Sequence, residues 1–157
     1  MKKTILASAL VVATSPLWAG GQSISMDAVP AVALEVAKRA VPQVTLDKAG
    51  TEVSSDGILE YEISGKNANG KQVEVDVTAD GSIKEIESEI SPEEVPQNVV
   101  SKLKAYLPDF KPSFVEQSQR PNFIDWYEFE GVHNGREIDV EITASGGVII
   151  IGDDAAI

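Results

Sequence analysis

The sequence predicts an α+β fold of two tandem repeats, each a helix followed by a three- to four-stranded antiparallel sheet. The first observation is an internal repeat: residues 28–69 match the second half of the chain at a shift of 66, which becomes 65 near the first turn. The second is the alternation of apolar and polar residues that marks half-buried strands. The third is an Asn-Gly turn at matching positions, Asn69-Gly70 and Asn134-Gly135.

A repeat of this length is a whole supersecondary unit. Units of about 60 residues are marginally stable alone. We therefore expect the two copies to share a core or to dock sheet to sheet. The predicted segments are a signal peptide over residues 1–19, a first repeat over 20–90 and a second over 91–157.

Each repeat begins with a helix that lies between two prolines. The helices should start at Pro30 and Pro96, and they should end before Pro42 and Pro108, since the residue before proline avoids helical backbone angles. Ahead of the second helix, residues 91–94 (Ser-Pro-Glu-Glu) have the pattern of a short capped turn. Apolar residues at helical spacing mark the buried sides. They are Ala33, Ala37 and Val41 in the first helix, and Val99, Leu103 and Leu107 in the second.

The turn chemistry fixes the register of the second hairpin. A two-residue turn at Asn134-Gly135 pairs apolar residues with apolar residues on one face. The opposite face then collects mainly acidic residues. The apolar pairs are Tyr127 with Ile142 and Phe129 with Val140, and the other face pairs Trp126 with Thr143, Glu128 with Glu141, and Glu130 with Asp139.

The first hairpin requires a different turn. A two-residue turn at Asn69-Gly70 would place Ile63 opposite Asp76, whereas a three-residue loop with a left-handed Gly70 pairs Ile63 with Val75 and Tyr61 with Val77. The offset in the repeat is thus a change of hairpin type that preserves the core. Further strands are expected over residues 82–90 and 148–151, with edge strands near 45–53 and 113–119.

Residues 1–19 have the features of a secretory signal peptide. Lys2 and Lys3 give a positive start, residues 5–13 form a short apolar stretch, and Ala19 is a small residue suited to cleavage. The stretch is too short for a stable membrane anchor. No cysteine follows it that could carry a lipid or form a disulfide. We therefore expect an exported, soluble protein of the bacterial periplasm with no membrane insertion.

The remainder of the chain is strongly acidic. Lys2 and Lys3 belong to the predicted signal, so 11 of the 13 basic residues stand against 25 acidic ones, a net charge of −14. Nucleic acids and anionic lipids require positive patches, and neither is expected as a partner. A basic protein partner, bound cations, or solubility alone would each explain the charge.

At these residues the chain resembles a known family. A helix ending at proline followed by YEISGKNANGKQVEVDVTADGSIKEIE (61–87) is similar to the PepSY and PepSY-like domains of exported bacterial proteins. The segment AYLPDF followed by WYEFEGVHNGREIDVEITASGG (126–147) fits as well or better. The resemblance covers nearly all of the chain after residue 19. It implies a small helix-plus-sheet module, found in peptidase propeptides and similar in shape to tandem-repeat β-lactamase inhibitor proteins. Members are proposed to bind or inhibit peptidases, and no family catalytic residue can be carried over.

Reaction chemistry finds little support in the residues. His133 should lie exposed on a hairpin tip, where nothing orients it as a base or a ligand. The carboxylates line an open strand face, whereas paired acid–base catalysis needs a cleft and opposed environments. Residues 80–82 (Asp-Gly-Ser) lack the ligand spacing of a calcium loop and indicate a turn. We expect no enzyme activity, no metal site and no cofactor.

The acidic strand face of the second repeat is the candidate binding surface. Like charges opposite one another cost stability, so they either serve recognition or only keep the sheet from aggregating. Trp126 replaces Glu60 of the first repeat on that face. An exposed tryptophan among polar groups is typical of an interface anchor, and packing between the repeats is the alternative. The candidate partner-binding residues are Trp126, Glu128, Glu130, Asp139 and Glu141.

These observations favour a non-enzymatic protein-binding module whose partner is a basic protein or a peptidase that it inhibits. The alternative function is an envelope sensor that binds a ligand or a divalent cation on the acidic face.

Overall fold

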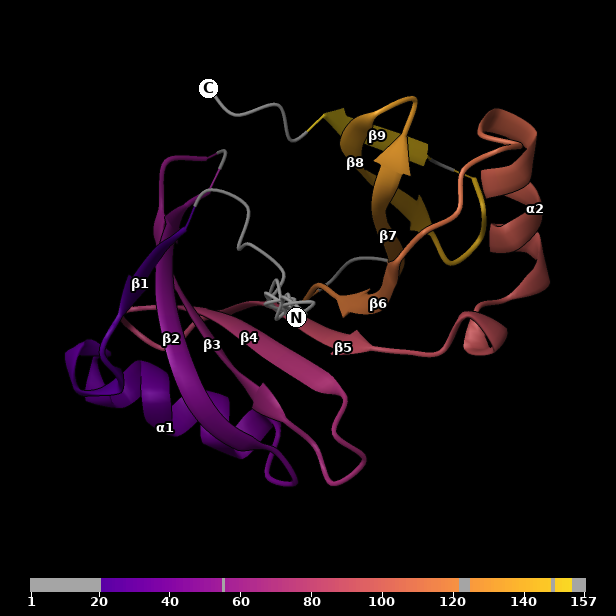
Figure 1. The fold of residues 1–157 in the computed structure, drawn as a ribbon. Coiled ribbons are helices and arrows are strands. Elements are labelled where there is room, and N and C mark those ends of the chain that lie inside the picture. Colours follow the sequence, from indigo (N-terminus) through magenta and orange to yellow (C-terminus); the bar gives the residue numbers. More distant parts are fainter. Residues whose placement is uncertain (1–20, 55, 122–124, 148, 154–157) are drawn as a thin grey trace, which may run out of the picture.

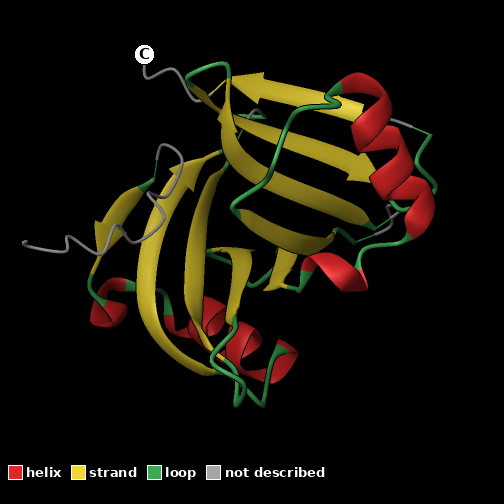
Figure 2. Ribbon diagram, turned by 45° about the vertical axis from the view of Figure 1, so that its right-hand side comes forward, coloured by secondary structure: helices red, strands yellow, loops and turns green. Residues whose placement is uncertain are grey.

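The computed structural model describes residues 21–54, 56–121, 125–147 and 149–153, so the predicted signal peptide lies outside the described residues. Within them, nine strands form one antiparallel sheet whose order follows the chain (Figures 1 and 2). The strands are β1 (Gln22–Ile24), β2 (Thr45–Val53), β3 (Leu59–Lys66), β4 (Gln72–Thr78), β5 (Ile83–Glu89), β6 (Phe114–Gln119), β7 (Trp126–His133), β8 (Arg136–Thr143) and β9 (Ile149–Asp153). The helices are α1 (Ala31–Ala40) and α2 (Gln97–Tyr106), each preceded by a short 3-10 turn, η1 (Met26–Ala28) and η2 (Pro92–Glu94).

The predicted fold class is wrong, because the protein is mainly β and has one continuous sheet instead of two small ones. The halves join where β5 pairs with β6, from Ile86 opposite Gln119 to Glu89 opposite Glu116. They neither share a core nor dock face to face. The physical reason is that β5 and β6 would each end a smaller sheet with a row of unpaired backbone groups, and their pairing satisfies both rows.

The two strands that were predicted to lie at edges are both internal. β2 lies between β1 and β3. β6 lies between β5 and β7, at the junction of the two halves. The edges of the sheet within the described residues are instead the short strands β1 and β9. The predicted residue ranges of β2 and β6 were close to correct, but each strand has a neighbour on both sides.

Both helices lie on the outer side of the curved sheet (Figures 1 and 2). Their bounds confirm the sequence prediction, with Pro30 and Pro96 immediately before the first turn. Each helix buries a small apolar stripe against the strands of its own half, so the sheet carries two separate hydrophobic clusters. The first includes Ala33, Ala37, Ile63, Val75 and Val77, and the second includes Val99, Leu103, Tyr127, Phe129, Val140 and Ile142.

The turn before α2 is capped as the sequence predicts. The Ser91 backbone N–H donates to a Glu94 carboxylate oxygen at 2.7 Å. The same oxygen accepts from Lys71 Nζ at 2.7 Å, which ties the end of the β3–β4 hairpin to the start of the second half. These bonds, Lys71 foremost, lower the pKa of Glu94 to about 2.

The register of both hairpins is confirmed. Tyr127 lies opposite Ile142 and Phe129 opposite Val140. In the first hairpin Ile63 lies opposite Val75, and the Asn67 N–H bonds Lys71 O at 3.0 Å to close a three-residue loop. Asn134 at φ 53° and Gly135 at φ 78° form the two-residue turn that the sequence predicts.

The left-handed conformation of Gly135 leads to a stability prediction. Gly135→Val should lower the free energy of unfolding by about 1 kcal/mol or more, because a β-branched residue resists positive φ. Gly135→Asn is the matched control and should cost less, since asparagine tolerates this region. Urea denaturation of the two variants measures the difference. Equal unfolding free energies for wild type and Gly135→Val would contradict the turn assignment.

Candidate binding face

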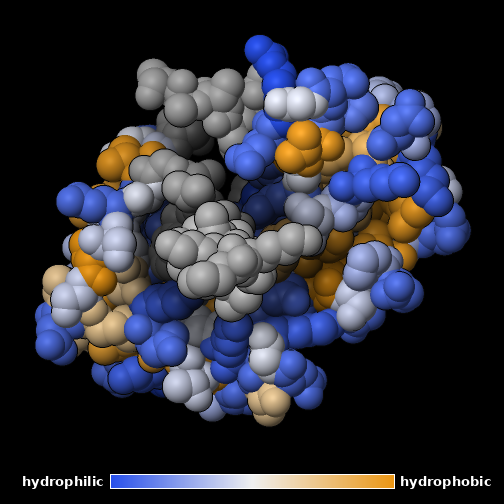
Figure 3. All heavy atoms as spheres, in the orientation of Figure 1, coloured by the Kyte–Doolittle hydropathy of each residue, from blue (hydrophilic) through white to orange (hydrophobic). Residues whose placement is uncertain are grey.

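The inner face of the sheet, opposite the helices, is lined with carboxylates, and we call it the acidic face. Strand register places these side chains together, because alternate residues of β3, β4, β7 and β8 point away from the two cores. The β5–β6 pairing continues the row from one half to the other. Hydrophilic side chains border the middle of this face in Figure 3. Its acidic residues are Glu52, Glu60, Glu62, Glu74, Asp76, Glu85, Glu87, Glu89, Glu116, Glu128, Glu130, Asp139 and Glu141.

Except for Glu52, these carboxylates are less exposed than a solvated surface requires. Glu60, Glu62 and Glu116 are 9%, 6% and 8% exposed. Burial, followed by the charge of neighbouring carboxylates, raises the pKa of Glu116 to about 8, that of Glu74 to about 7 and that of Glu128 to about 9. Many protons therefore stay on this face at neutral pH. The expectation of an open, solvated face was wrong.

Arg120 lies among the carboxylates of the acidic face and was not found from the sequence. Its guanidinium donates from Nε to Glu85 Oε1 at 2.7 Å, from Nη1 to Glu141 Oε2 at 3.1 Å and from Nη2 to Glu128 Oε1 at 3.2 Å. Burial acts to lower the pKa of Arg120, but hydrogen bonds and charge from Glu141 and Glu85 raise it overall. Ser118 Oγ also donates to Glu85. Three strands thus converge on one cation.

Trp126 is half-buried under Arg120, whose guanidinium carbon lies 5.3 Å from the ring centroid. It pairs with Ser118 on β6 and Thr143 on β8. The predicted exposed anchor is therefore covered by a cation from its own half of the chain. The other candidate residues, Glu128, Glu130, Asp139 and Glu141, are half-buried beside it and across the β7–β8 pairing, as the predicted register requires.

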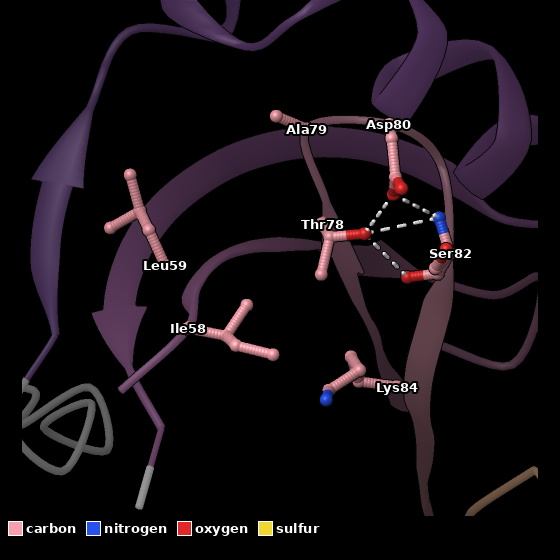
Figure 4. Close-up of a pocket in the computed structure, with 7 residues that line it drawn as sticks. All are labelled: Ile58, Leu59, Thr78, Ala79, Asp80, Ser82 and Lys84. Atoms are coloured by element: carbon pink, nitrogen blue, oxygen red, sulfur yellow. Dashed lines mark hydrogen bonds between the residues drawn. The ribbon is translucent and has the colours of Figure 1, made fainter. Parts of the chain in front are cut away.

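The remaining sequence candidates, His133 and residues 80–82, lie outside the acidic face. His133 is half-buried, not exposed, and its ring meets the Phe110 ring edge-on at 6.1 Å between centroids. Residues 80–82 form the predicted turn, in which Asp80 accepts from Thr78 Oγ1 at 2.5 Å and from the Ser82 N–H at 3.1 Å. An open pocket of about 500 Å³ lies beside this turn (Figure 4). The polar groups of the turn form hydrogen bonds with one another. The pocket is lined by Ile58, Leu59, Thr78, Ala79, Asp80, Ser82 and Lys84.

Three sets of carboxylates on the acidic face come close enough to hold a cation. Within each set the oxygen atoms lie within 4.8 Å of one another. Two of the sets include Glu128, which accepts a hydrogen bond from Arg120. In the set without Glu128, no residue bonds Arg120 among the described hydrogen bonds. The sets are Glu74, Asp76 and Glu87; Glu85, Glu87 and Glu128; and Glu128, Asp139 and Glu141.

A single antiparallel sheet with two helices on one face and carboxylates on the other defines the structural class. No protein-family model matches the sequence and no curated protein matches it, so the predicted PepSY membership is not confirmed. Among solved structures, a DUF2874 family protein from Bacteroides uniformis matches with a TM-score of 0.64 and 18% identity, over 82% of this chain and 92% of that one.

Two further neighbours have the same fold. A BLIP-like protein from Bacteroides fragilis matches with a TM-score of 0.59 and 18% identity, over 78% of this chain and 84% of that one. A protein from Bacteroides eggerthii, described as a candidate periplasmic protein, matches with a TM-score of 0.63 and 19% identity, over 80% and 88%. At these identities the similarity shows the fold alone. Separately, no helix in the described part of the chain is long and apolar enough to cross a membrane.

The raised pKa values predict that stability falls as pH rises. The folded state keeps protons that the unfolded chain releases above the usual glutamate pKa of 4.5. This contribution to the free energy of unfolding should therefore be fully present below about pH 4.5 and be lost as the pH rises toward about 9. Glu116→Gln should flatten this dependence and gain about 2 kcal/mol at the alkaline end. Denaturation at several pH values tests this, and a pH-independent unfolding free energy would contradict it. Glu35→Gln, at a side chain 70% exposed, is the control and should change little.

Removal of Arg120, in contrast to Glu116→Gln, should lower the free energy of unfolding. Arg120→Met leaves Glu85, Glu128 and Glu141 without their cation, and it should cost about 2 kcal/mol or more at pH 8. The loss should shrink near pH 5, because Glu128, whose pKa burial raises to about 9, is then fully protonated and needs no cation. Arg39→Met removes an ion pair whose side chains are 68% and 70% exposed, and it should cost under about 0.5 kcal/mol. Similar losses for both variants would show that the Arg120 cluster is no more than a surface pair.

Proposed function

We propose that the protein is a non-enzymatic protein-binding module of the bacterial envelope, and that its acidic face binds a basic segment of a partner protein. The observation that carries this proposal is the continuous row of poorly exposed carboxylates across the β5–β6 junction. Such a row destabilises the free protein, since like charges oppose one another across strands. A cationic partner would remove that cost on binding.

Electrostatic complementarity also explains why the partner should be a protein segment with positive charge. Complementary charge speeds association and rejects partners of the wrong sign. The chain after the predicted signal peptide has a net charge of −14, so it attracts a cationic partner over longer distances than the acidic face alone would. The BLIP-like neighbour supports a protein-binding role. Within that role, the more specific proposal is that the protein inhibits a peptidase.

The location in the envelope is part of the proposal. The signal-like residues 1–19 support export, and so does the candidate periplasmic neighbour. Expression of the full chain in a bacterium should give an envelope-fraction protein that begins at Gly20, as read by mass spectrometry. Full-length protein in the cytoplasmic fraction would contradict it.

A second candidate function is binding of a divalent cation. It is favoured by the three carboxylate sets with oxygens within 4.8 Å. Calcium takes six to eight oxygen ligands. If calcium is the ligand, calcium alone should raise the melting temperature strongly, and basic peptides should compete with it for the face.

An oligo-arginine peptide is a direct probe of the proposed function. Trp126 is the single tryptophan once the predicted signal is removed, and it contacts Arg120 on the acidic face, so its fluorescence reports on the site. We expect binding that weakens steeply with salt. Glu116→Gln with Glu130→Gln should lower the affinity at least about tenfold, or about 1.4 kcal/mol.

The matched control replaces Glu35 and Glu93, which lie outside the acidic face on α1 and η2, by glutamine. It removes the same charge and should change the affinity much less. Equal losses in the two double variants, or no binding at low salt, would refute the acidic face as the binding surface. Thermal melts at the same pH confirm that the variants are folded.

A further inference from the structure

We propose that Glu74, Asp76 and Glu87 form a socket for an arginine side chain of the partner. This inference rests on the proposed function and names the contact that would give the acidic face its specificity. It also explains a buried oxygen, Asp76 Oδ1, that the described residues leave without a hydrogen bond.

The Arg120 cluster shows how this sheet binds a guanidinium. Glu128 and Glu141 are directly opposite one another on β7 and β8, and Glu85 reaches in from β5. All five hydrogen-bond donors of a guanidinium favour such convergent carboxylates, and its flat face stacks on an aromatic ring. The Arg120 cluster is therefore an example, within the same sheet, of the arginine binding that we infer for the socket.

The proposed socket repeats part of that arrangement on the neighbouring strands. Glu74 and Glu87 are directly opposite one another on β4 and β5, and Asp76 is the next residue of β4 on the same face. Their oxygens lie within 4.8 Å of one another. Within the described residues, no ion pair joins these three carboxylates to a lysine or arginine.

One enclosed oxygen atom of the socket points to a missing donor. Asp76 Oδ1 is buried and has no hydrogen-bond partner among the described residues. Buried polar atoms in native proteins nearly always have partners, so this oxygen requires an explanation. An incoming N–H donor supplies one.

A guanidinium fits better than a calcium ion or an ammonium group. Calcium takes six to eight oxygen ligands, whereas this set brings together one oxygen from each of three carboxylates, so second carboxylate oxygens or water would have to complete the shell. An ammonium has three donors and a stronger hydration shell, whereas a guanidinium has five donors in a planar fork and is more weakly hydrated. The half-buried position of the three carboxylates therefore selects arginine over lysine.

Proton release should accompany binding. Burial and neighbouring carboxylates raise the pKa of Glu74 to about 7 and hold the pKa values of Asp76 and Glu87 well above their usual range. A cation in the socket favours the ionised forms, so protons leave as it enters. Affinity for arginine should therefore increase as pH rises from about 6 to about 8.

Isothermal titration of the protein with oligo-arginine and with oligo-lysine of equal length tests the socket. We expect wild type to prefer oligo-arginine at least about tenfold and to release protons, seen as a dependence of heat on the buffer. Glu74→Gln with Glu87→Gln should abolish the preference. Glu116→Gln with Glu130→Gln is the matched double variant on the same face, and it should weaken both peptides while keeping the preference.

Each other outcome overturns the socket in a distinguishable way. Equal affinity for the two peptides, or a preference that survives Glu74→Gln with Glu87→Gln, refutes the socket and leaves the proposed function standing. Calcium binding that only this variant loses would reassign the three carboxylates to a metal. No peptide binding at all refutes both proposals. The variant should melt no lower than wild type at about pH 8, because it removes like-charge repulsion.

Discussion

The pairing of β5 with β6 holds the two halves of the sheet together. Four residue pairs, from Ile86–Gln119 to Glu89–Glu116, join two halves that otherwise have separate hydrophobic clusters. Without them, each half would expose a strand edge and carry its own small acidic patch. With them, Glu85 of the first half reaches Arg120 of the second, and the acidic face becomes continuous.

This continuity has an electrostatic cost, and the ion pairs of Arg120 offset part of it near the junction. Glu128 keeps a pKa near 9 despite its ion pair with Arg120, because burial and the charges of Glu85 and Glu141 outweigh one cation. Stability alone would favour glutamine or threonine at such positions, since they keep hydrogen bonding without the charge. Carboxylates that destabilise the free protein are most simply explained by a cationic ligand that stabilises the bound one.

Local chemistry explains which features could be predicted from the sequence. The Asn134-Gly135 turn and the alternation around it set the β7–β8 register within a few residues, and prolines bounded the helices. The β5–β6 pairing joins Ile86 to Gln119 across a helix and a long connection, and no local pattern encodes it. Arg120 follows β6 outside any periodic segment, so its role emerges only when β5, β7 and β8 converge on it. The alternating acidic residues predicted a solvent-exposed strand face, because a sequence does not show the curvature of a sheet.

The direction of the pKa shifts bears on the kind of chemistry this face can perform. Acid–base catalysis by paired carboxylates needs environments that push two pKa values apart, so that one group is protonated while the other is ionised. On this face the resolved shifts of Glu62, Glu74, Asp76, Glu87, Glu116 and Glu128 all go upward, and burial is the leading cause of each. Groups that shift together act as a proton reservoir, which exchanges protons for an arriving positive charge. That property suits recognition of a cationic partner better than turnover of a substrate.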